Sequence, residues 1–211
     1  MPKEREIRNS IGHLVQIKAH MLSMNASLKA LKTRPVCGPP LVRLRQSYLD
    51  LRMIVEEMML LSVSAHRTAG EQISKDLRKN YNASQKMRLL EKINPRFFPD
   101  AIKLVQTEEK GVEAKFVSLE KEYLCQSVAQ DMYNKSGNFL HASYKALSVE
   151  EFDQSVDELE TFFNLTATLL HTFEVDISGN PLKLFSSLRT HRAHRFADLD
   201  RQRLYLRAKP P

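Results

Sequence analysis

The chain has 211 residues, of which 42% are hydrophobic and 27% are charged, and its formal net charge at pH 7 is +7. This length allows one large domain with a buried core, and the composition is typical of an ordered globular protein rather than a disordered chain. The two cysteines lie in separate contexts, and no apolar run approaches the roughly 20 residues of a transmembrane helix or the core of a signal peptide. We therefore expect a cytoplasmic protein, neither secreted nor inserted in a membrane.

Charge is distributed unevenly along the chain. Lys and Arg outnumber Asp and Glu by 19 to 9 in residues 1–106 and by 7 to 2 in residues 189–211, whereas residues 107–174 carry 5 against 13. A polarised field of this kind attracts phosphate backbones or favours contact between copies, and it also occurs on solvated surfaces that have no partner. The charge pattern alone leaves these three interpretations open.

The first predicted element is one long helix between Ile7 and Leu31. Its apolar residues recur as a heptad repeat, interrupted near the start by Ser10, and such a repeat buries a narrow stripe. The stripe packs either inside a helical bundle or against a second copy, and the pattern does not choose between them. The apolar positions are Ile7, Leu14, Met21 and Leu28, with Ile17, Met24 and Leu31 between them.

Prolines in residues 34–40 end that helix, because proline removes a backbone donor and clashes with the preceding turn. Residues 41–67 predict a second helix with the wide apolar face of a central, well-buried element. A short helix is predicted at 84–93. The segment INPRFFPDAI then flanks Phe97 and Phe98 with prolines, which favours an extended connector that presses both rings onto the core. Contact of these rings with a ligand is the alternative.

Two more helices are predicted in the second half of the chain. Residues 112–133 show helical spacing of apolar side chains, and a capping-box signature at Ser148 and Glu151 predicts the start of another helix that continues to Leu170. The apolar stripes are Phe116, Leu119 and Tyr123 in the first, and Val149, Phe152, Val156, Leu159, Phe163, Thr166 and Leu170 in the second.

The C-terminal part changes character. Residues 173–188 alternate around a Gly-Asn-Pro turn and are compatible with a small β-hairpin, and residues 189–211 are rich in arginine, as in a basic helix or a disordered arm. We therefore predict an all-α fold, a helical bundle with a long N-terminal helix. Its parts are a bundle domain at residues 1–172, a possible hairpin appendix at 173–188 and a basic tail at 189–211.

Several signatures of catalysis are absent from the sequence. It contains no GxxxxGK[ST] or GxGxxG loop, no HExxH helix and no GxSxG elbow, which disfavours kinase, dehydrogenase, zincin and hydrolase functions. His191 and His194 have helical spacing but no carboxylate or cysteine beside them, so we expect neither a metal nor another cofactor. His13 and His20 flank the heptad stripe one heptad apart, and we expect them on a solvated edge.

Arg52 and Glu56 lie four residues apart in an otherwise apolar helix and therefore share one face. If that face is buried, both side chains need partners, because an unpaired charge in a core costs several kcal/mol. Either the two residues form an ion pair, or they line a polar pocket.

The stretch YNKSGNFLHASY, from Tyr133 to Tyr144, is unusually polar for a helix. Lys135 points roughly 120° away from His141 on an ideal helix, and Gly137 suggests close packing or a bend, since glycine costs about 1 kcal/mol relative to alanine in a helix. Amide, imidazole and ammonium groups together suit binding and cleavage of a phosphodiester. A histidine satisfied by a neighbouring carboxylate is the alternative. The residues that share one side are Asn134, Asn138, His141 and Lys145.

The order of three segments resembles a known family. An Arg52-x-x-x-Glu56 helix, then INPRFFP at 93–99, then Tyr-x-x-x-Gly-x-Phe-Leu-His-Ala beginning at Tyr133, are similar to a group of bacterial proteins that look like distant members of the HEPN superfamily. The similarity spans about residues 41–172. This superfamily consists of compact helical bundles and includes metal-independent endoribonuclease toxins and phage-defence proteins whose paired motifs meet at a homodimer cleft.

The resemblance implies a homodimeric RNA-cleaving enzyme. His141 takes the place of the family's histidine as general acid or base, Lys135 falls at its basic position, and Asn138 is a nearby polar group for stabilising the phosphorane. Lysine lacks the bidentate fork of arginine, which is a departure from the family pattern. The superfamily also contains non-catalytic modules that bind protein or nucleic acid, and that interpretation stays open. In this hypothesis Arg52, Glu56 and Asn134 line or brace the site, and the basic tail holds the RNA backbone through Arg189, Arg192 and Arg195.

Overall fold

The computed structural model describes residues 4–33, 40–63, 83–108, 114–140, 147–177 and 180–185. The protein is mostly helical, as predicted. The predictions for His141, Lys145 and residues 189–211 concern parts of the chain outside the described residues. The helices are α1 (Glu4–Lys32), α2 (Pro40–Val63), α4 (Ala83–Ile93), α5 (Gln126–Leu140) and α6 (Val149–His171), and the strands are β1 (Asp100–Gln106), β2 (Ala114–Ser118), β3 (Thr172–Ile177) and β4 (Asn180–Phe185).

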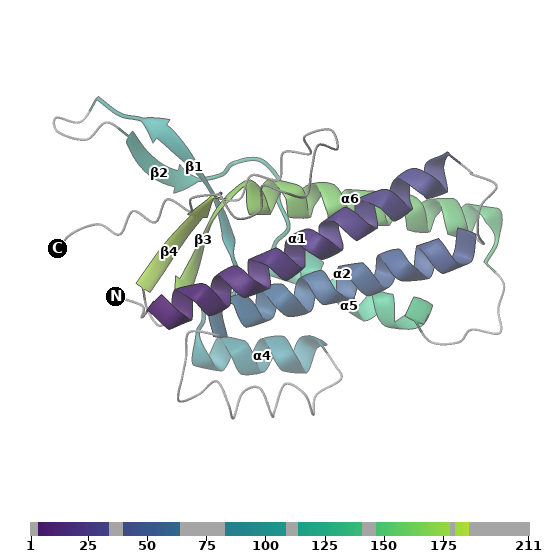
Figure 1. Cartoon of the computed structure of the whole chain (residues 1–211), viewed down its shortest axis with the longest axis horizontal. Helices are drawn as coiled ribbons and strands as arrows, with labels where there is room; N and C mark the ends of the chain where they lie inside the picture. The colour runs from purple at the N-terminus through teal and green to yellow at the C-terminus, as the bar shows by residue number, and fades with distance from the viewer. Residues whose placement is uncertain are drawn as a thin grey trace.

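The helices form a bundle with a small sheet at one end. Figure 1 shows α1, α2, α5 and α6 running along the long axis, with the strands gathered at the end drawn on the left. The end of α1, the start of α2, the end of α5 and the start of α6 lie at the opposite end. The short helix α4 packs against α5 and α2.

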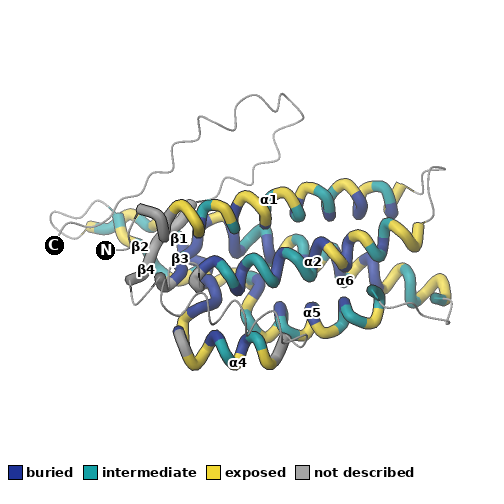
Figure 2. Tube along the Cα trace, turned by 60° about the horizontal axis from the view of Figure 1, so that its bottom comes forward, coloured by how far each residue is buried: buried dark blue, intermediate teal, exposed yellow. Residues whose placement is uncertain are grey.

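The heptad stripe of α1 is buried inside the molecule, where it packs against α2 and α6. Figure 2 shows the buried positions of α1 on its inward side. Ser10, which interrupts the stripe, is 1% exposed, and its Oγ donates a hydrogen bond to the carbonyl oxygen of Leu61 at 3.1 Å. The stripe is therefore occupied within one chain. Its buried members are Leu14, Ile17, Met21, Met24, Leu28 and Leu31.

His13 and His20 lie on the side of α1 that faces α2, so the prediction of a solvated edge is wrong. His13 Nδ1 lies 2.6 Å from Glu57 Oε2, and His20 Nδ1 lies 2.9 Å from Asp50 Oδ1. Both imidazoles are only about a quarter exposed, at 24% and 26%. The seven-residue spacing that flanked the apolar stripe placed both histidines beside carboxylates of an antiparallel neighbour.

The sheet has four antiparallel strands in the order β2-β1-β3-β4. The predicted hairpin is present as β3 and β4, and β3 starts directly where α6 ends. The prediction of a helix over residues 112–133 is wrong for its first half, because residues 114–118 form β2 and α5 begins only at Gln126. A short run of aromatic and β-branched residues does not distinguish strand from helix by spacing alone. The all-α prediction therefore missed β1 and β2.

The aromatic pair of the connector is buried, as predicted. Phe97 and Phe98 are 0% and 8% exposed and meet edge to face with ring centroids 6.1 Å apart. The capping box at the start of α6 is also confirmed, since Ser148 Oγ accepts from the Glu151 amide and the Glu151 carboxylate accepts from the Ser148 amide. Further along α6, Phe162 is buried in place of the predicted Phe163. A strict heptad drifts relative to the 3.6-residue turn, which explains this shift.

Candidate functional site

Helix α5 carries most of the described part of the predicted site, and it is continuous from Gln126 to Leu140. Ser136 is fully buried and its Oγ donates to the Tyr133 carbonyl oxygen at 2.6 Å. A Cβ atom added to Gly137 would meet nothing within 4 Å. The glycine therefore marks neither close packing nor a break in the helix, contrary to the expectation from the sequence.

The continuous helix sends its polar side chains in different directions. Lys135 forms an ion pair with Glu158 of α6, and its side chain is 40% exposed. Asn134 and Asn138 are exposed on α5. His141 follows α5 outside the described residues, so its predicted chemistry stays a prediction. Of the three predicted catalytic residues, the structure therefore describes Lys135 and Asn138, and it pairs the first with a carboxylate.

Arg52 and Glu56 belong to a polar cluster between α2, α4 and α5. Arg52 Nε lies 3.4 Å from Glu56 Oε1, and the Tyr133 hydroxyl donates to the same oxygen at 2.5 Å. Lys86 of α4 reaches this oxygen at 3.3 Å and the Tyr133 hydroxyl oxygen at 3.4 Å. Of the two possibilities left open by the sequence, this geometry corresponds to an ion pair, here extended by a phenol and a second cation.

The electrostatics of this cluster keep the phenol neutral. Burial and the hydrogen bond to the Glu56 carboxylate raise the pKa of Tyr133 above its ordinary value. The Arg52 guanidinium carbon lies 4.3 Å from the centroid of the Tyr133 ring, and Lys86 Nζ lies 5.7 Å from it, both within the range of cation–π attraction. The cluster thus joins three helices through one carboxylate and one ring. Its members satisfy one another, which indicates a bracing role.

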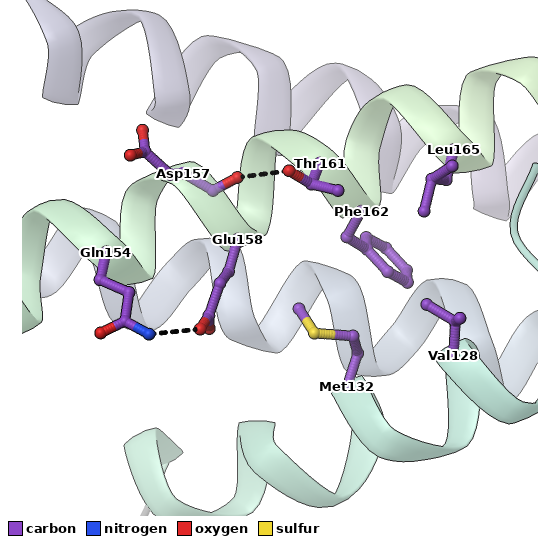
Figure 3. A pocket seen from close by; sticks show the side chains of 8 residues that line it. All are labelled: Val128, Met132, Gln154, Asp157, Glu158, Thr161, Phe162 and Leu165. Carbon is purple, nitrogen blue, oxygen red and sulfur yellow. Dashed lines mark hydrogen bonds between the residues drawn. The ribbon is translucent and has the colours of Figure 1, made fainter. Parts of the chain in front are cut away.

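An open groove lies between α5 and α6, with a volume of about 450 Å³. Figure 3 shows Val128 and Met132 pointing from α5 towards α6, with Phe162 and Leu165 of α6 beside them. These four side chains make an apolar floor, and Phe162 is 1% exposed. The remaining lining residues form a polar rim on α6: Gln154, Asp157, Glu158 and Thr161.

The rim of this groove is acidic. Gln154 Nε2 donates to Glu158 Oε1 at 3.2 Å, and Thr161 Oγ1 donates to the carbonyl oxygen of Asp157 at 2.9 Å, as the dashed lines in Figure 3 mark. The Asp157 carboxylate is exposed and makes no ion pair with the described residues. Lys135 lies three residues after Met132 on α5 and forms an ion pair with Glu158. The groove therefore offers an apolar floor beside the Asp157 carboxylate, which has no ion-pair partner among the described residues, and the Glu158 carboxylate, which Lys135 already pairs.

A second cavity, of about 790 Å³, lies at the bundle end opposite the sheet. It is lined by the end of α1, the start of α2 and the start of α6, with Lys32 and Arg43 among its polar residues and Phe152 among its apolar ones. Lys32 Nζ is bound to the Glu160 carboxylate at 2.5 Å. Leu147, six positions after His141, also lines it.

The architecture defines a class: a mostly helical bundle with a small antiparallel sheet. Searches against protein-family models, curated proteins and solved structures found no match to this chain. Within the described ranges, no group of three or more His, Cys, Asp or Glu residues is arranged to hold a metal ion. No helix in the part of the chain that the structure describes combines the length and the apolar character needed to cross a bilayer.

Sequence reasoning missed Lys86, Tyr133 as a hydrogen-bond donor, and the groove. Lys86 occurs in a short helix whose partner is set by the fold, so no local pattern points to Glu56. Val128 and Met132 have the i, i+4 spacing of one helical face, and that face was a detectable signal. The acidic residues of α6 were visible as a charge excess, but only packing places them beside this face.

Proposed function

We propose that this protein is a non-catalytic helical binding module that takes a protein segment carrying both basic and apolar side chains in the groove between α5 and α6. The observation that carries this proposal is the groove itself, with an apolar floor of Val128, Met132, Phe162 and Leu165 beside an acidic rim. Apolar floors with a few oriented polar groups are typical of binding sites, and complementary charge steers the partner and fixes its register.

The pairing of the predicted catalytic cation supports binding over cleavage. Lys135 is held by Glu158, so a phosphate would have to compete with a carboxylate for the ammonium group. Arg52 is likewise engaged by Glu56 and by the Tyr133 ring. A nucleic acid also fits the groove poorly, because the rim repels its phosphates.

A direct test is titration of a fluorescent peptide that alternates arginine and leucine, of a sequence unrelated to this chain, into the full-length protein. We expect binding that weakens with salt, because it depends on Asp157. Asp157→Lys should weaken it by at least about tenfold, in line with reversal of a charge at a polar contact. Glu120→Lys is the matched control, since it makes the same change of charge at an exposed acidic residue outside the groove. Equal affinity in all three proteins would contradict the proposal.

The second candidate function is the metal-independent endoribonuclease of a homodimer, related to toxins or phage defence, that the HEPN resemblance implies. The exposure of Asn134 and Asn138 on the helix that leads to His141 favours it, because exposed amides are accessible to RNA. In this mechanism His141 transfers the proton as the ribose 2′-hydroxyl attacks the adjacent phosphate, and Lys135 and Asn138 stabilise the phosphorane.

This candidate has its own test. The purified protein is incubated with single-stranded RNA in EDTA, beside His141→Ala and Lys135→Ala. Cleavage by the unaltered chain that is lost in His141→Ala would establish the nuclease and displace the binding module as the main function. Equal background cleavage by all three proteins would exclude it.

A further inference from the structure

The point at which the chain leaves the described fold lies beside α6. In the β3–β4 pairing, Phe185 is the register partner of Thr172, the residue that follows the last residue of α6. The chain continues for 26 residues after Phe185. The C-terminal segment therefore starts near the end of the helix that forms one wall of the groove.

The segment is long enough to reach the whole groove. A helix rises about 1.5 Å per residue, so Leu165 lies about 10 Å from the end of α6 and Gln154 about 27 Å from it. An extended chain spans about 3.3 Å per residue, so roughly ten residues cover this path. About half of the residues after Phe185 are therefore enough to span the distance from the end of α6 to Gln154.

The chemistry of the segment complements the groove. Residues 189–211 carry seven Lys or Arg against two Asp, and they also contain Phe196, Leu199 and Tyr205. The groove offers the opposite combination, an apolar floor beside the exposed Asp157 carboxylate and the Glu158 carboxylate that Lys135 pairs. A tethered segment of this kind binds at a high effective concentration, in the millimolar range for a short linker, so weak contacts are sufficient.

We propose that residues 189–211 bind the groove between α5 and α6 of the same chain and thereby occupy the site that an external partner needs. This proposal rests on the proposed binding function and names the groove's resident occupant. An external segment must then displace the C-terminal segment, so the free chain is self-inhibited. Loss of basic charge from residues 189–211 opens the groove to partners.

The position of Cys125 permits a direct experiment on the full-length chain. This cysteine is exposed and immediately precedes α5, three residues before Val128. A nitroxide attached there, in a Cys37→Ser background, should weaken the NMR amide signals of residues 189–211 relative to the reduced label. Asp157→Lys should restore those signals, whereas Glu120→Lys, which makes the same change of charge outside the groove, should leave them weakened. Signals that the nitroxide does not weaken would overturn the proposal.

A mixed sample distinguishes the same chain from a second copy. Chains that are enriched in ¹⁵N and carry no nitroxide are mixed with nitroxide-bearing chains of natural isotope content. We expect no weakening of the C-terminal signals in this mixture. Weakening there would replace the intramolecular contact by one between copies. Weakening or shifts that appear only after single-stranded RNA is added would overturn the proposal in favour of RNA binding by the basic segment.

A peptide titration separates failure of this inference from failure of the proposed function. The variant Arg201→Ser/Arg203→Ser/Arg207→Ser should bind the unrelated basic peptide about tenfold more tightly than the unaltered chain, since the intramolecular competitor is weakened. Equal, measurable affinity in both proteins would overturn self-inhibition while leaving the binding module intact. If neither protein binds the peptide, both proposals are wrong.

Discussion

Lys135 and Glu158 join α5 to α6 through an ion pair beside the groove. The side chains are 40% and 26% exposed, so the pair is screened by water and contributes little to the free energy of unfolding. Lys135→Met should lower that free energy by less than about 1 kcal/mol. It should also increase the affinity of the groove for a basic peptide, because it removes the ammonium group that pairs with Glu158. Urea unfolding and peptide titration measure the two effects.

Lys135→Arg is the matched control for this prediction, since it keeps the charge and should change neither property appreciably. A loss of stability in Lys135→Met above about 2 kcal/mol would contradict the assignment of a screened surface pair.

The Tyr133 hydroxyl and the Glu56 carboxylate should be energetically coupled. Tyr133→Phe removes a hydrogen bond to a charged group, and we expect a loss of about 1.5 kcal/mol. Glu56→Gln weakens the same bond and also the contacts with Arg52 and Lys86. A double-mutant cycle should therefore give a coupling of about 1 kcal/mol, measured by urea unfolding. Additive losses would show that the phenol and the carboxylate do not interact.

Gly137→Ala should stabilise the protein by about 0.5–1 kcal/mol. The residue lies inside a continuous helix, an added methyl group meets open space, and alanine loses less conformational entropy on folding. Gly12→Ala in α1 is a parallel case with the same open surroundings and should show a similar gain in thermal unfolding. Destabilisation by Gly137→Ala would imply that Gly137 contacts something outside the described residues.

The packing of α1 predicts a strong contrast between two neighbouring residues. Met24 is fully buried, and Met24→Ala should cost about 2–5 kcal/mol, since it leaves a cavity in the core. Leu22 is 59% exposed, and Leu22→Ala should change stability by no more than about 0.5 kcal/mol. Comparable losses in the two variants would indicate that the outer face of α1 is covered by another molecule. Urea unfolding at two protein concentrations checks this.

Stability should fall at alkaline pH because of two buried phenols. Burial raises the pKa of Tyr48 from its ordinary 10.0 to about 12, and the pKa of Tyr133 is raised as well. Each folded-state pKa exceeds its unfolded value, so this contribution is complete below pH 10 and is lost as pH rises through the folded pKa. Between pH 10 and 12 we expect a decline of up to about 1.4 kcal/mol per pH unit for each phenol.

Urea unfolding at pH 9, 10 and 11 measures this slope. The double variant Tyr48→Phe/Tyr133→Phe should flatten it, whereas an unchanged slope would assign the alkaline loss to other groups. Tyr48 is a suitable probe because its ring stacks on Phe139 of α5, with centroids 3.9 Å apart, and is fully buried.

The helices were largely predictable because their signals are local. Heptad spacing located α1, and the capping-box pair of Ser148 and Glu151 located the start of α6. Strand β2 was not predictable in this way, because Phe116 and Val117 fit a helix and a strand equally well over so short a run. Their pairing with β1 is set by tertiary contacts, which no local pattern encodes.

The candidate site was predictable only in part, for the same reason. The spacing of Arg52 and Glu56 predicted that both lie on one helical face, but it did not choose between an ion pair and the lining of a pocket. Lys86 completes the cluster from a position 30 residues away in the chain, and Tyr133 from 77 residues away. The partner of Lys135 was likewise unpredictable, since only the tertiary fold brings Glu158 of α6 next to it. The residue types predicted contacts between charged side chains, but only the tertiary structure determines which of these side chains pair.

The pairing of β1 with β3, the strand that continues directly from α6, has a consequence for the order of folding. The α1–α2 pair forms between elements adjacent in sequence, so it closes with little loss of chain entropy. The pairing of β1 with β3 brings together parts of the chain that are far apart in sequence. Next to this pairing, Arg96 Nη2 donates to Glu174 Oε1 at 2.9 Å, across a separation of 78 positions. Non-local strand pairing is slow in general. We therefore expect the helical hairpin to form first in refolding, with the sheet locking the second half of the chain to it in a later, slower phase.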